Sequence, residues 1–552
     1  MIDLTGIEPS QEMADKLFPT TYIGPSWQTT PDGEWKLPKR TLGWEILGWC
    51  AQWLTTPDGD PWIFTPEQAR LILWLYEVDH RGRRTYRKGV VQRAKGHGKD
   101  PFAAAICLVE LFGPCKFSHF DGEGQPVGKE NTSSWVQLAA TTTEQNKNTM
   151  LLIPSMLPKA TREFYGLEVQ KQIIHISGTG RRLEAVSSNF AGLEGARPSF
   201  ALLNETHHWQ VSRGGDQLYQ VIRNNVQKVQ GWFLCITNAY QPGEGSVAED
   251  IRLAVMRERE GLAADTGWFF DSVEAHPEAV MTPDWSVFIL RRVYGDSYWV
   301  KLDDIANQSL LDTSMPVSKL LRMFYNQIVA SEDALFSEAD WDGARKHGAR
   351  LEPGDEIVLA FDGGKTDDAT ALIALRLSDR VLFPIHIWQK PDGPSGDNWH
   401  INEEEVDSMV HLCFREYKVR AFYADVALWE SWIQSWADLY RETLLIKASP
   451  RSAVGFDMRG NQQKITRGNE ALLQSILDRK TFHNGDPHLR RHALNAKRRE
   501  NQWGLTFGKE SRESPHKVDA YAAALLAYIA ANDYAESGKQ PAREYTRRLY
   551  QF

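Results

Sequence analysis

The sequence predicts an α/β chain of two main domains, the first with a mainly parallel sheet and the second with a mixed sheet. In the first half, buried apolar strand patterns such as Trp135–Ala140 and Gly231–Thr237 alternate with helical patterns. The stretch Leu351–Asp355, LEPGD, is typical of a domain boundary. After it, apolar strands follow one another across short turns. Parallel strands need helical crossovers, whereas short turns join antiparallel strands, so the two halves differ in sheet type.

The length and composition are those of a globular chain. Its 552 residues are enough for two to four domains, and 42% are hydrophobic and 24% charged. No uninterrupted apolar stretch is long enough to span a bilayer, and Met1–Thr20 lacks the layout of a signal peptide. We therefore expect a soluble, cytoplasmic protein with no membrane partner.

Charge and cysteine content exclude some classes of protein. The net charge of −9 argues against a basic coat for nucleic acid over the whole surface, although a local basic channel remains compatible with it. The five cysteines have no C-x-x-C spacing, which indicates neither a disulfide framework nor a zinc cluster.

The N-terminal stretch leads into a helix with a clear start. Residues 1–44 are rich in Pro, Thr and Gly, and we expect them to form an arm. Thr65 is the predicted N-cap of the next helix and Pro66 its first residue. On this helix, Gln68 is a candidate for binding the edge of an adenine, and a surface glutamine is an equal alternative.

A candidate phosphate loop follows the apolar strand Tyr86–Val91 and precedes the helical pattern Phe102–Leu111. In this context the backbone N–H groups of the turn and the positive end of the helix bind phosphate, with Lys99 as a point charge. An ordinary βα turn is the alternative. The loop departs from G-x-x-x-x-G-K-[ST] at Arg93 and Asp100. The candidate ligands are Arg93, Lys95, Gly96, His97, Gly98, Lys99 and Asp100.

Polar residues end two later apolar strands, where ligand chemistry belongs in a parallel sheet. Glu205 follows Phe200–Asn204 and is the candidate acid that deprotonates a water attacking a γ-phosphate, unless it is a plain surface acid. Thr237 and Asn238 end the next strand and are candidate γ-phosphate sensors or strand caps. Arg93 and Arg197 are candidates for neutralising transition-state charge. We expect His207 and His208 to be surface or interface residues, because no third metal ligand has a suitable spacing.

The second half carries a candidate metal site. Asp362 and Asp425 each follow an apolar strand, and Asp519 begins a long apolar helix. Three carboxylates brought together in this way can hold two divalent ions for phosphodiester cleavage. Taken alone, each of these aspartates is an ordinary turn or N-cap residue. The basic stretch Leu489–Arg499 would guide a phosphate backbone past the site, or would be a solvated helix face.

The ordered set of phosphate loop, LLNE, TNA, FDGG, YAD and KVD resembles the large subunit of the terminase of tailed bacteriophages, over roughly Thr65 to Ala531. The resemblance implies an ATP-driven motor that pumps double-stranded DNA into a procapsid and a ribonuclease-H-like nuclease that cuts concatemeric DNA. The implied organisation is an arm at 1–44, a P-loop ATPase domain at 45–265, a lid or linker at 266–350, a nuclease domain at 351–535 and a flexible basic tail at 536–552.

The same resemblance implies cofactors and partners. The cofactors are ATP and Mg²⁺, or Mn²⁺ in the nuclease site. The partners are DNA, the small terminase subunit and the portal protein, with a ring-shaped homo-oligomer working in the host cytoplasm. It implies that Lys99 and Gly98 bind phosphates, that Glu205 is the catalytic acid and that Thr237 and Asn238 couple hydrolysis to motion. The metal ligands would be Asp362, Asp425 and Asp519.

The departures at Asp100 and Asn204 form a pair. The usual pattern has a hydroxyl after the lysine and an aspartate before the glutamate, so a carboxylate and a neutral oxygen ligand have exchanged places. Asp100 is then a candidate Mg²⁺ ligand. Two other functions remain open: a helicase–nuclease of recombination or repair, which needs a second motor domain, and an assembly scaffold with a degenerate nucleotide site.

Overall fold

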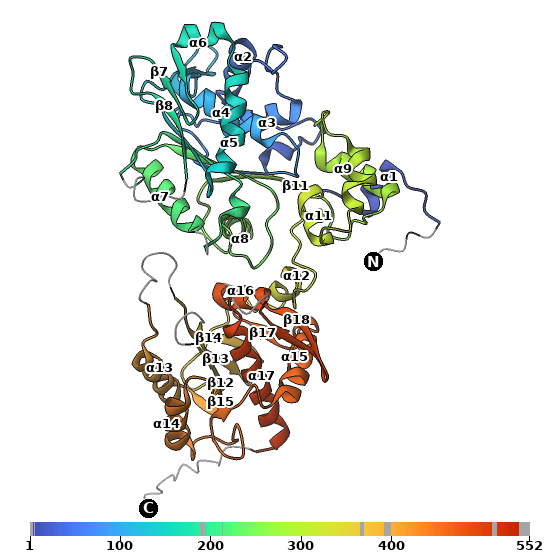
Figure 1. The fold of residues 1–552 in the computed structure, drawn as a ribbon, viewed down its shortest axis with the longest axis vertical. Helices are drawn as coiled ribbons and strands as arrows, with labels where there is room; N and C mark the ends of the chain where they lie inside the picture. Colours follow the sequence, from blue (N-terminus) through green and yellow to red (C-terminus); the bar gives the residue numbers. More distant parts are fainter. Residues whose placement is uncertain are drawn as a thin grey trace, which may run out of the picture. The chain divides into compact units, whose positions relative to one another are not determined.

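The computed structural model describes residues 4, 6–187, 193, 195–211, 214–364, 369–390, 399–509 and 516–539, without the side chains of 143–145, 147 and 148. The chain divides into two compact units (Figure 1). Unit 1 comprises Met1–Gln241 and Gly245–Ser331, and unit 2 comprises Pro242–Glu244 and Glu332–Phe552. Among the described residues, every helix is too short or too polar to cross a bilayer.

Unit 1 is built on a nine-stranded sheet in which six neighbouring strands are parallel. Its order is β1-β11-β2-β10-β9-β5-β8-β7-β6, and the run from β11 to β8 is parallel, as the alternation of strand and helix patterns predicts. The strands are β1 Thr21–Ile23, β2 Lys88–Gln92, β5 Trp135–Ala139, β6 Leu167–Val169, β7 Ile173–Ile176, β8 Arg182–Val186, β9 Phe200–Asn204, β10 Trp232–Thr237 and β11 Trp268–Glu274. A separate hairpin joins β3 Lys116–Phe120 to β4 Pro126–Lys129.

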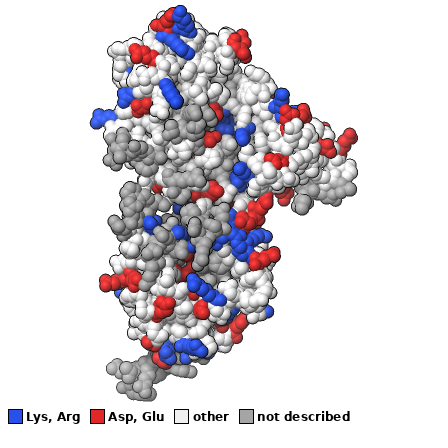
Figure 2. Space-filling model, viewed as in Figure 1, with Lys and Arg blue, Asp and Glu red and all other residues white. Residues whose placement is uncertain are grey.

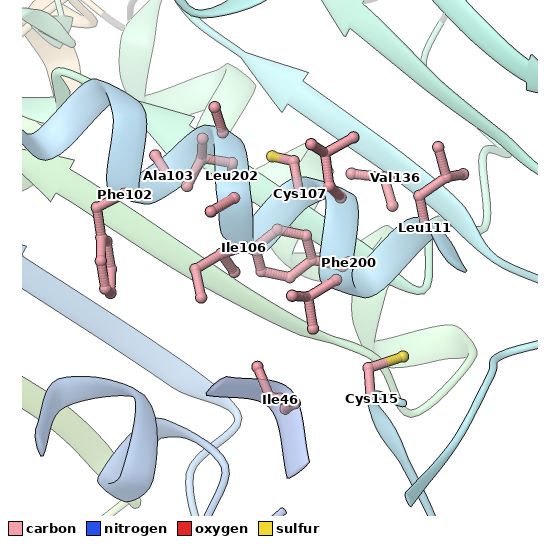
Figure 3. Packing of buried hydrophobic residues seen from close by; sticks show 14 of the residues in the cluster. Ile46, Phe102, Ala103, Ile106, Cys107, Leu111, Cys115, Val136, Phe200 and Leu202 are labelled. Carbon is pink, nitrogen blue, oxygen red and sulfur yellow. The ribbon is translucent and has the colours of Figure 1, made fainter. Parts of the chain in front are cut away.

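Apolar residues on both sides of each strand explain why helices cover both faces of this sheet. In β9, Phe200 and Leu202 pack with α4 in one core, as Figure 3 shows, while Ala201 and Leu203 pack into the core that contains α7 and α8. Alternate side chains of a strand point to opposite faces, so a continuous apolar run needs two cores. The helices are α2 Gly43–Trp53, α3 Pro66–Leu75, α4 Lys99–Phe112, α5 Thr143–Leu152, α6 Lys159–Tyr165, α7 Gly215–Lys228 and α8 Val247–Arg259.

The segment predicted as a lid or linker, 266–350, is divided in the structure. Its first element, β11, lies in the main sheet between β1 and β2, and β1 belongs to the predicted N-terminal arm. The helices that follow β11 form an additional apolar cluster of unit 1 together with α1, and the unit ends at Ser331. These helices are α1 Gln11–Leu17, α9 Pro283–Tyr294, α10 Leu302–Asn307 and α11 Val317–Phe324.

Unit 2 contains a six-stranded mixed sheet of order β16-β15-β12-β13-β14-β17. The strands β12, β13 and β14 are antiparallel, and β15 runs parallel to β12, so the sheet is mixed, as the sequence predicts. The strands are β12 Glu356–Gly363, β13 Thr370–Arg376, β14 Val381–Trp388, β15 Lys418–Asp425, β16 Gly455–Phe456 and β17 Phe482–His483. In β12, Val358 and Ala360 face the core of α15, α16 and α17, while Leu359 and Phe361 face that of α13 and α14. These helices are α13 Glu403–Glu416, α14 Glu430–Tyr440, α15 Gln462–Leu477, α16 Pro487–Asn495 and α17 Asp519–Ser537.

Unit 2 begins before the predicted boundary at Leu351. Helix α12 Glu338–Asp342 belongs to it, because Trp341 is fully buried in its core and Arg490 pairs with Glu338 and Asp342, both at 2.7 Å. The LEPGD stretch is therefore a turn within this unit. The predicted tail from residue 540 onward lies outside the described residues.

The basic stretch Leu489–Arg499 splits between α16 and β18 Lys497–Asn501, which pairs with β19 Gly504–Gly508. Arg490 and Lys497 are mostly buried and pair with carboxylates of their own unit. Figure 2 shows acidic and basic side chains interspersed on the drawn face of each unit. Both observations agree with the net charge of −9, and neither supports a broad basic surface.

Candidate nucleotide and metal sites

The turn between β2 and α4 presents backbone N–H groups without partners. Gly96 and Gly98 adopt φ values of 82° and 90°, which glycine tolerates and other residues rarely do. In the described part of the chain, the N–H groups of Gly96, Gly98 and Lys99 donate no hydrogen bond. They lie at the first turn of α4, where the helix dipole adds positive potential. This is the arrangement of an anion site, as the sequence predicts.

Lys99 bends back onto the same loop. Its Nζ donates to the carbonyl oxygens of Arg93 at 3.1 Å and Ala94 at 2.9 Å. Burial lowers the pKa of Lys99 to about 8, although the nearby carboxylates of Asp100 and Glu205 oppose the shift. Asp100 and Glu205 offset the desolvation of the amine only in part. A phosphate bound at the loop would add further negative charge beside it.

Arg93 faces away from the predicted phosphate position. Its guanidinium is buried, with Nη2 2.6 Å from Asp271 Oδ1 and Nε 3.0 Å from Glu67 Oε1. Its Nη1 donates to the carbonyl oxygens of Gln92 and Asp271. Because these partners use its donors, the geometry does not favour the predicted roles of Arg93 in phosphate binding or transition-state stabilisation.

Sequence reasoning missed Glu67 and Asp271, the carboxylates that hold Arg93. Burial opposes the ionisation of Glu67, but Arg93 and His97 hold its pKa at about 2. Burial raises the pKa of Asp271, which also accepts hydrogen bonds from Ser26 and Trp27 of the N-terminal segment. His97 is buried, with Nε2 3.5 Å from Glu67 Oε1, and burial lowers its pKa. The loop is thus tied to α3, β11 and the arm.

The predicted adenine ligand Gln68 lies next to Glu67 at the start of α3. It forms a capping box with Thr65: its N–H donates to Thr65 Oγ1, and its Oε1 accepts from the Thr65 N–H, both at 3.3 Å. A capping box explains this glutamine locally, and contact with a base would then fall to its Nε2.

The candidate catalytic residues lie at one edge of the sheet. Strand β10 lies between β2 and β9, and Thr237 is paired in register with Gln92. Glu205 follows β9, and its N–H donates to the Ile236 carbonyl at 2.8 Å. Glu205 adopts φ 54°, a left-handed conformation that is uncommon outside glycine and often found at functional positions. The structure therefore brings the phosphate loop, Glu205 and Thr237 to adjacent strand ends.

The side chains beside Glu205 give His207 a role that sequence reasoning missed. His207 is partly buried, and desolvation of its ring lowers its pKa; its backbone N–H and ring Nδ1 both lie 3.1 Å from Thr237 Oγ1. Glu205, His207 and His208 offer ligand atoms within 4.8 Å of one another. A third group that could join the two histidines around a metal ion is thus the neighbouring Glu205. His207 also connects the Glu205 turn directly to the Thr237–Asn238 turn.

Three remaining candidates lie in different surroundings. Asp100 is in the first turn of α4. Asn204 ends β9, and its Nδ2 donates to Thr149 Oγ1 at 3.3 Å. Arg197 is exposed and precedes β9, so it lies at the opposite end of that strand from Glu205, about 17 Å of strand away. Within one chain, Arg197 is therefore not positioned to act at the phosphate loop.

In unit 2, two of the three candidate aspartates occupy neighbouring strand ends. Phe361 of β12 is paired with Ala424 of β15, so the next residues, Asp362 and Asp425, lie side by side. Asp425 Oδ1 accepts from the Met458 N–H at 3.0 Å, and burial raises the pKa of Asp425. Asp519 is the first residue of α17, the helix that packs on β12, β13 and β15.

The start of α17 is held by residues that were predicted only as part of a basic stretch. His492 Nδ1 accepts from the Ala520 N–H at 2.9 Å, and Asn495 Nδ2 donates to the Lys517 carbonyl at 3.1 Å. Burial lowers the pKa of His492 to about 3, so its ring is neutral. Lys509 Nζ lies 3.8 Å from Asp519 Oδ1. These contacts fix the helix end that carries Asp519.

Comparison with solved structures returns bacteriophage large terminases. The large terminase of bacteriophage HK97 has a TM-score of 0.49 at 15% identity, over 89% of this chain and 100% of that one. The large terminase of a thermophilic bacteriophage has a TM-score of 0.33 at 9% identity, over 85% and 99%. The large terminase nuclease of the thermophilic phage G20c, solved with bound magnesium, has a TM-score of 0.26 at 14% identity, over 36% and 97%.

Sequence comparison gives nearer relatives. No protein-family model matches the chain. The gene 13 protein of Mycobacterium phage L5 is 40% identical, over 94% of this chain and 96% of its own length. The gene 13 protein of Mycobacterium phage D29 is 39% identical over the same shares. The chain therefore belongs to the family of the mycobacteriophage gene 13 proteins.

Proposed function

We propose that this chain is the large terminase subunit of a phage, in which unit 1 hydrolyses ATP to move double-stranded DNA into a procapsid and unit 2 cuts the DNA. The observation that carries the motor is the edge of the unit 1 sheet, where unpaired loop amides, Lys99, Glu205 and Thr237 occupy the ends of β2, β9 and β10. Membership of a phage protein family supports the context.

Each residue has one task in the proposed ATP site. The loop amides and Lys99 hold the phosphates, which compensates the buried charge of the lysine. Glu205 orients and deprotonates the attacking water. Thr237 accepts a hydrogen bond from the His207 N–H, so the state of the Glu205 turn is passed to Thr237 and Asn238. Mg²⁺ would neutralise phosphate charge, and Asp100 with Asn204 provides the hard oxygen donors that it prefers.

The proposed nuclease site takes its ligands from Asp362, Asp425 and Asp519. Asp362 and Asp425 lie at neighbouring strand ends, and Asp519 begins the helix that packs on those strands. Burial raises the pKa of Asp425, as expected for a carboxylate that binds a cation. Carboxylates in this arrangement suit Mg²⁺ or Mn²⁺, which activates water and stabilises the leaving oxygen. Work in the host cytoplasm with the small subunit, the portal and a ring of copies follows from the terminase assignment.

A helicase–nuclease is the main competing function. It would need a second motor domain after Asn238. That stretch instead supplies β11 to the first sheet and the helices α8 to α11 to the same unit. The other alternative, an assembly scaffold with a degenerate nucleotide site, is supported only by the departures from the usual pattern at Asp100 and Asn204.

The test is to measure ATP hydrolysis and DNA cutting on the purified full chain with Mg²⁺ and linear DNA. We expect Glu205→Gln to lose ATP hydrolysis and keep cutting, and Asp362→Ala to do the reverse. A chain that hydrolyses no ATP with DNA present would contradict the motor and favour the scaffold. Loss of both activities in each variant would contradict the assignment of the two sites to separate units.

A further inference from the structure

One short segment of unit 1 holds the outer side of the phosphate loop. We call residues Tyr294–Trp299, which begin at the last residue of α9, the strap. Three of its side chains donate to three consecutive loop carbonyls: Tyr294 OH to Lys95 at 2.7 Å, Trp299 Nε1 to Gly96 at 3.0 Å and Ser297 Oγ to His97 at 3.3 Å. Carbonyls held outward in this way leave the N–H groups of the loop facing the anion site.

The strap also reaches the start of α3. Asp296 Oδ2 accepts from the Glu67 N–H at 2.8 Å, and Glu67 is the neighbour of Gln68. The Trp299 ring lies against Gly98, because a Cβ placed on Gly98 would be 2.6 Å from Trp299 Cζ2. Gly98 precedes Lys99, so an aromatic ring borders the phosphate position on the side where α3 begins.

Two aromatic side chains are exposed at this border. Tyr298 is 87% exposed and Trp299 41%, and their rings meet edge to face with centroids 5.0 Å apart. The hydrogen bonds of Tyr294 and Ser297 already hold the loop, so packing explains the outward ring of Tyr298 poorly. Bases stack favourably on aromatic side chains in nucleic-acid complexes, and every base has a face for stacking.

We propose that Tyr298 and Trp299 form the platform for the base of the nucleotide whose phosphates occupy the loop. The base stacks on one ring and meets the other ring, inclined at 76° to the first, with its edge. This rests on the proposed nucleotide site. The platform selects by ring area, so it favours purine over pyrimidine nucleoside triphosphates and distinguishes the two purines little. The strap then has two tasks, since Trp299 fixes the loop through Nε1 and offers its ring to the ligand.

The test compares two ligands on the full chain with Mg²⁺, by calorimetry: ATP, and inorganic tripolyphosphate, which has no base. Tyr298→Ala should weaken ATP binding at least fivefold and leave tripolyphosphate binding within twofold. It should also reduce the preference for ATP over CTP. Trp299→Phe keeps a ring and removes the N–H donor, so it should weaken the binding of both ligands. The matched control is Phe164→Ala, which removes another exposed aromatic of unit 1, 69% exposed on α6, and should change neither ligand.

The outcomes separate the platform from the site on which it rests. The platform is overturned if Tyr298→Ala binds ATP as tightly as the parent chain, or if it loses affinity for ATP and tripolyphosphate equally. In either case the nucleotide site stands, provided that the parent chain binds both ligands. A parent chain that binds neither ligand overturns both. Because Tyr298 is 87% exposed, its replacement should not affect folding, and an unchanged unfolding transition checks this.

Discussion

Arg93 Nη2 lies 2.6 Å from Asp271 Oδ1, and both side chains are almost fully buried beneath the phosphate loop. Arg93 stands where a phosphate loop usually has its first glycine. This departure from the usual pattern therefore forms an internal ion pair that ties the loop to β11. Glu67 completes the pairing from α3.

We expect Arg93→Ala to destabilise unit 1 by about 3–5 kcal/mol, because it leaves two buried carboxylates without their cation. Arg93→Lys should recover only part of this loss, since a lysine cannot contact Glu67 and Asp271 through a planar fork. The measurement is the unfolding transition of unit 1 in denaturant. The matched control is Arg83→Ala, which breaks a surface pair with Asp79 and should leave that transition unchanged. Similar curves for both variants would refute the structural role of Arg93.

The second prediction concerns the proton on Lys99, whose pKa burial lowers to about 8. Below pH 8 the amine is charged in the folded and the unfolded chain, so the burial penalty is fully present. As the pH rises from about 8 towards the usual lysine range, the folded chain loses its proton first and the penalty disappears. A bound phosphate favours the charged amine, so ATP binding at pH 8.5 should take up a fraction of a proton.

Calorimetry at pH 8.5 in two buffers of different ionisation enthalpy measures this uptake. Lys99→Arg is the control, because an arginine stays protonated and should show no buffer dependence from this position. Equal binding enthalpies for the parent chain in both buffers would show that Lys99 is already charged without the ligand.

The third prediction concerns Asp100 and Asn204 together. If a carboxylate and an amide have exchanged places around Mg²⁺, Asn204→Asp adds repulsion beside triphosphate and Asp100→Thr leaves no carboxylate there. Each single variant should lower Mg²⁺-dependent ATP hydrolysis, and the double variant should recover part of it, with a coupling energy of about 1–3 kcal/mol. Strictly additive effects, or faster hydrolysis by Asn204→Asp, would mean that the two positions share no metal.

The fourth prediction uses the observed start of unit 2. A fragment from Glu332 keeps Trp341 in the core and Glu338 and Asp342 on Arg490. We expect it to unfold cooperatively and to cut DNA with Mg²⁺ or Mn²⁺ and no ATP. A fragment from Leu351 lacks Trp341 and the two carboxylates that pair with Arg490, and it should be several kcal/mol less stable. Thermal unfolding of the two fragments is the comparison, and equal stability would contradict the observed boundary.

The same fragment tests the aspartates. Asp362→Ala should abolish its cutting, because loss of one carboxylate changes both the charge and the geometry around the ions. The matched control is Asp379→Ala, which changes a carboxylate that pairs with Arg376 and Lys346. Full cutting by the double variant Asp362→Ala, Asp425→Ala would refute the metal site.

Local patterns made much of this architecture readable from the sequence. Strand, glycine turn and helix around Lys99 follow from side-chain periodicity and backbone freedom, and so do the strand ends at Glu205, Asp362 and Asp425. The pairing of these strands gives the predicted parallel and mixed sheets. Family resemblance then linked the motifs in their order along the chain.

The contacts that sequence reasoning missed join residues that are far apart in the sequence. Asp271 is 178 residues from Arg93, and Trp299 is 203 residues from Gly96, so no local pattern connects them. Strand β11 was assigned to a lid because its apolar run does not reveal which strands it joins. His207 was set aside because its partners, Glu205 and Thr237, come together only when β9 and β10 pair.

The claim that unit 1 hydrolyses ATP at the loop is tested most directly by separating nucleotide binding from turnover in Lys99→Ala and Glu205→Gln. Lys99 contacts phosphates before and during the reaction, so Lys99→Ala should weaken ATP binding and lower turnover. Glu205 acts on the water, so Glu205→Gln should bind ATP within about threefold of the parent and lose at least 99% of the hydrolysis, about 2.7 kcal/mol or more in barrier height. ATP hydrolysis by Glu205→Gln at the parent rate would contradict the account.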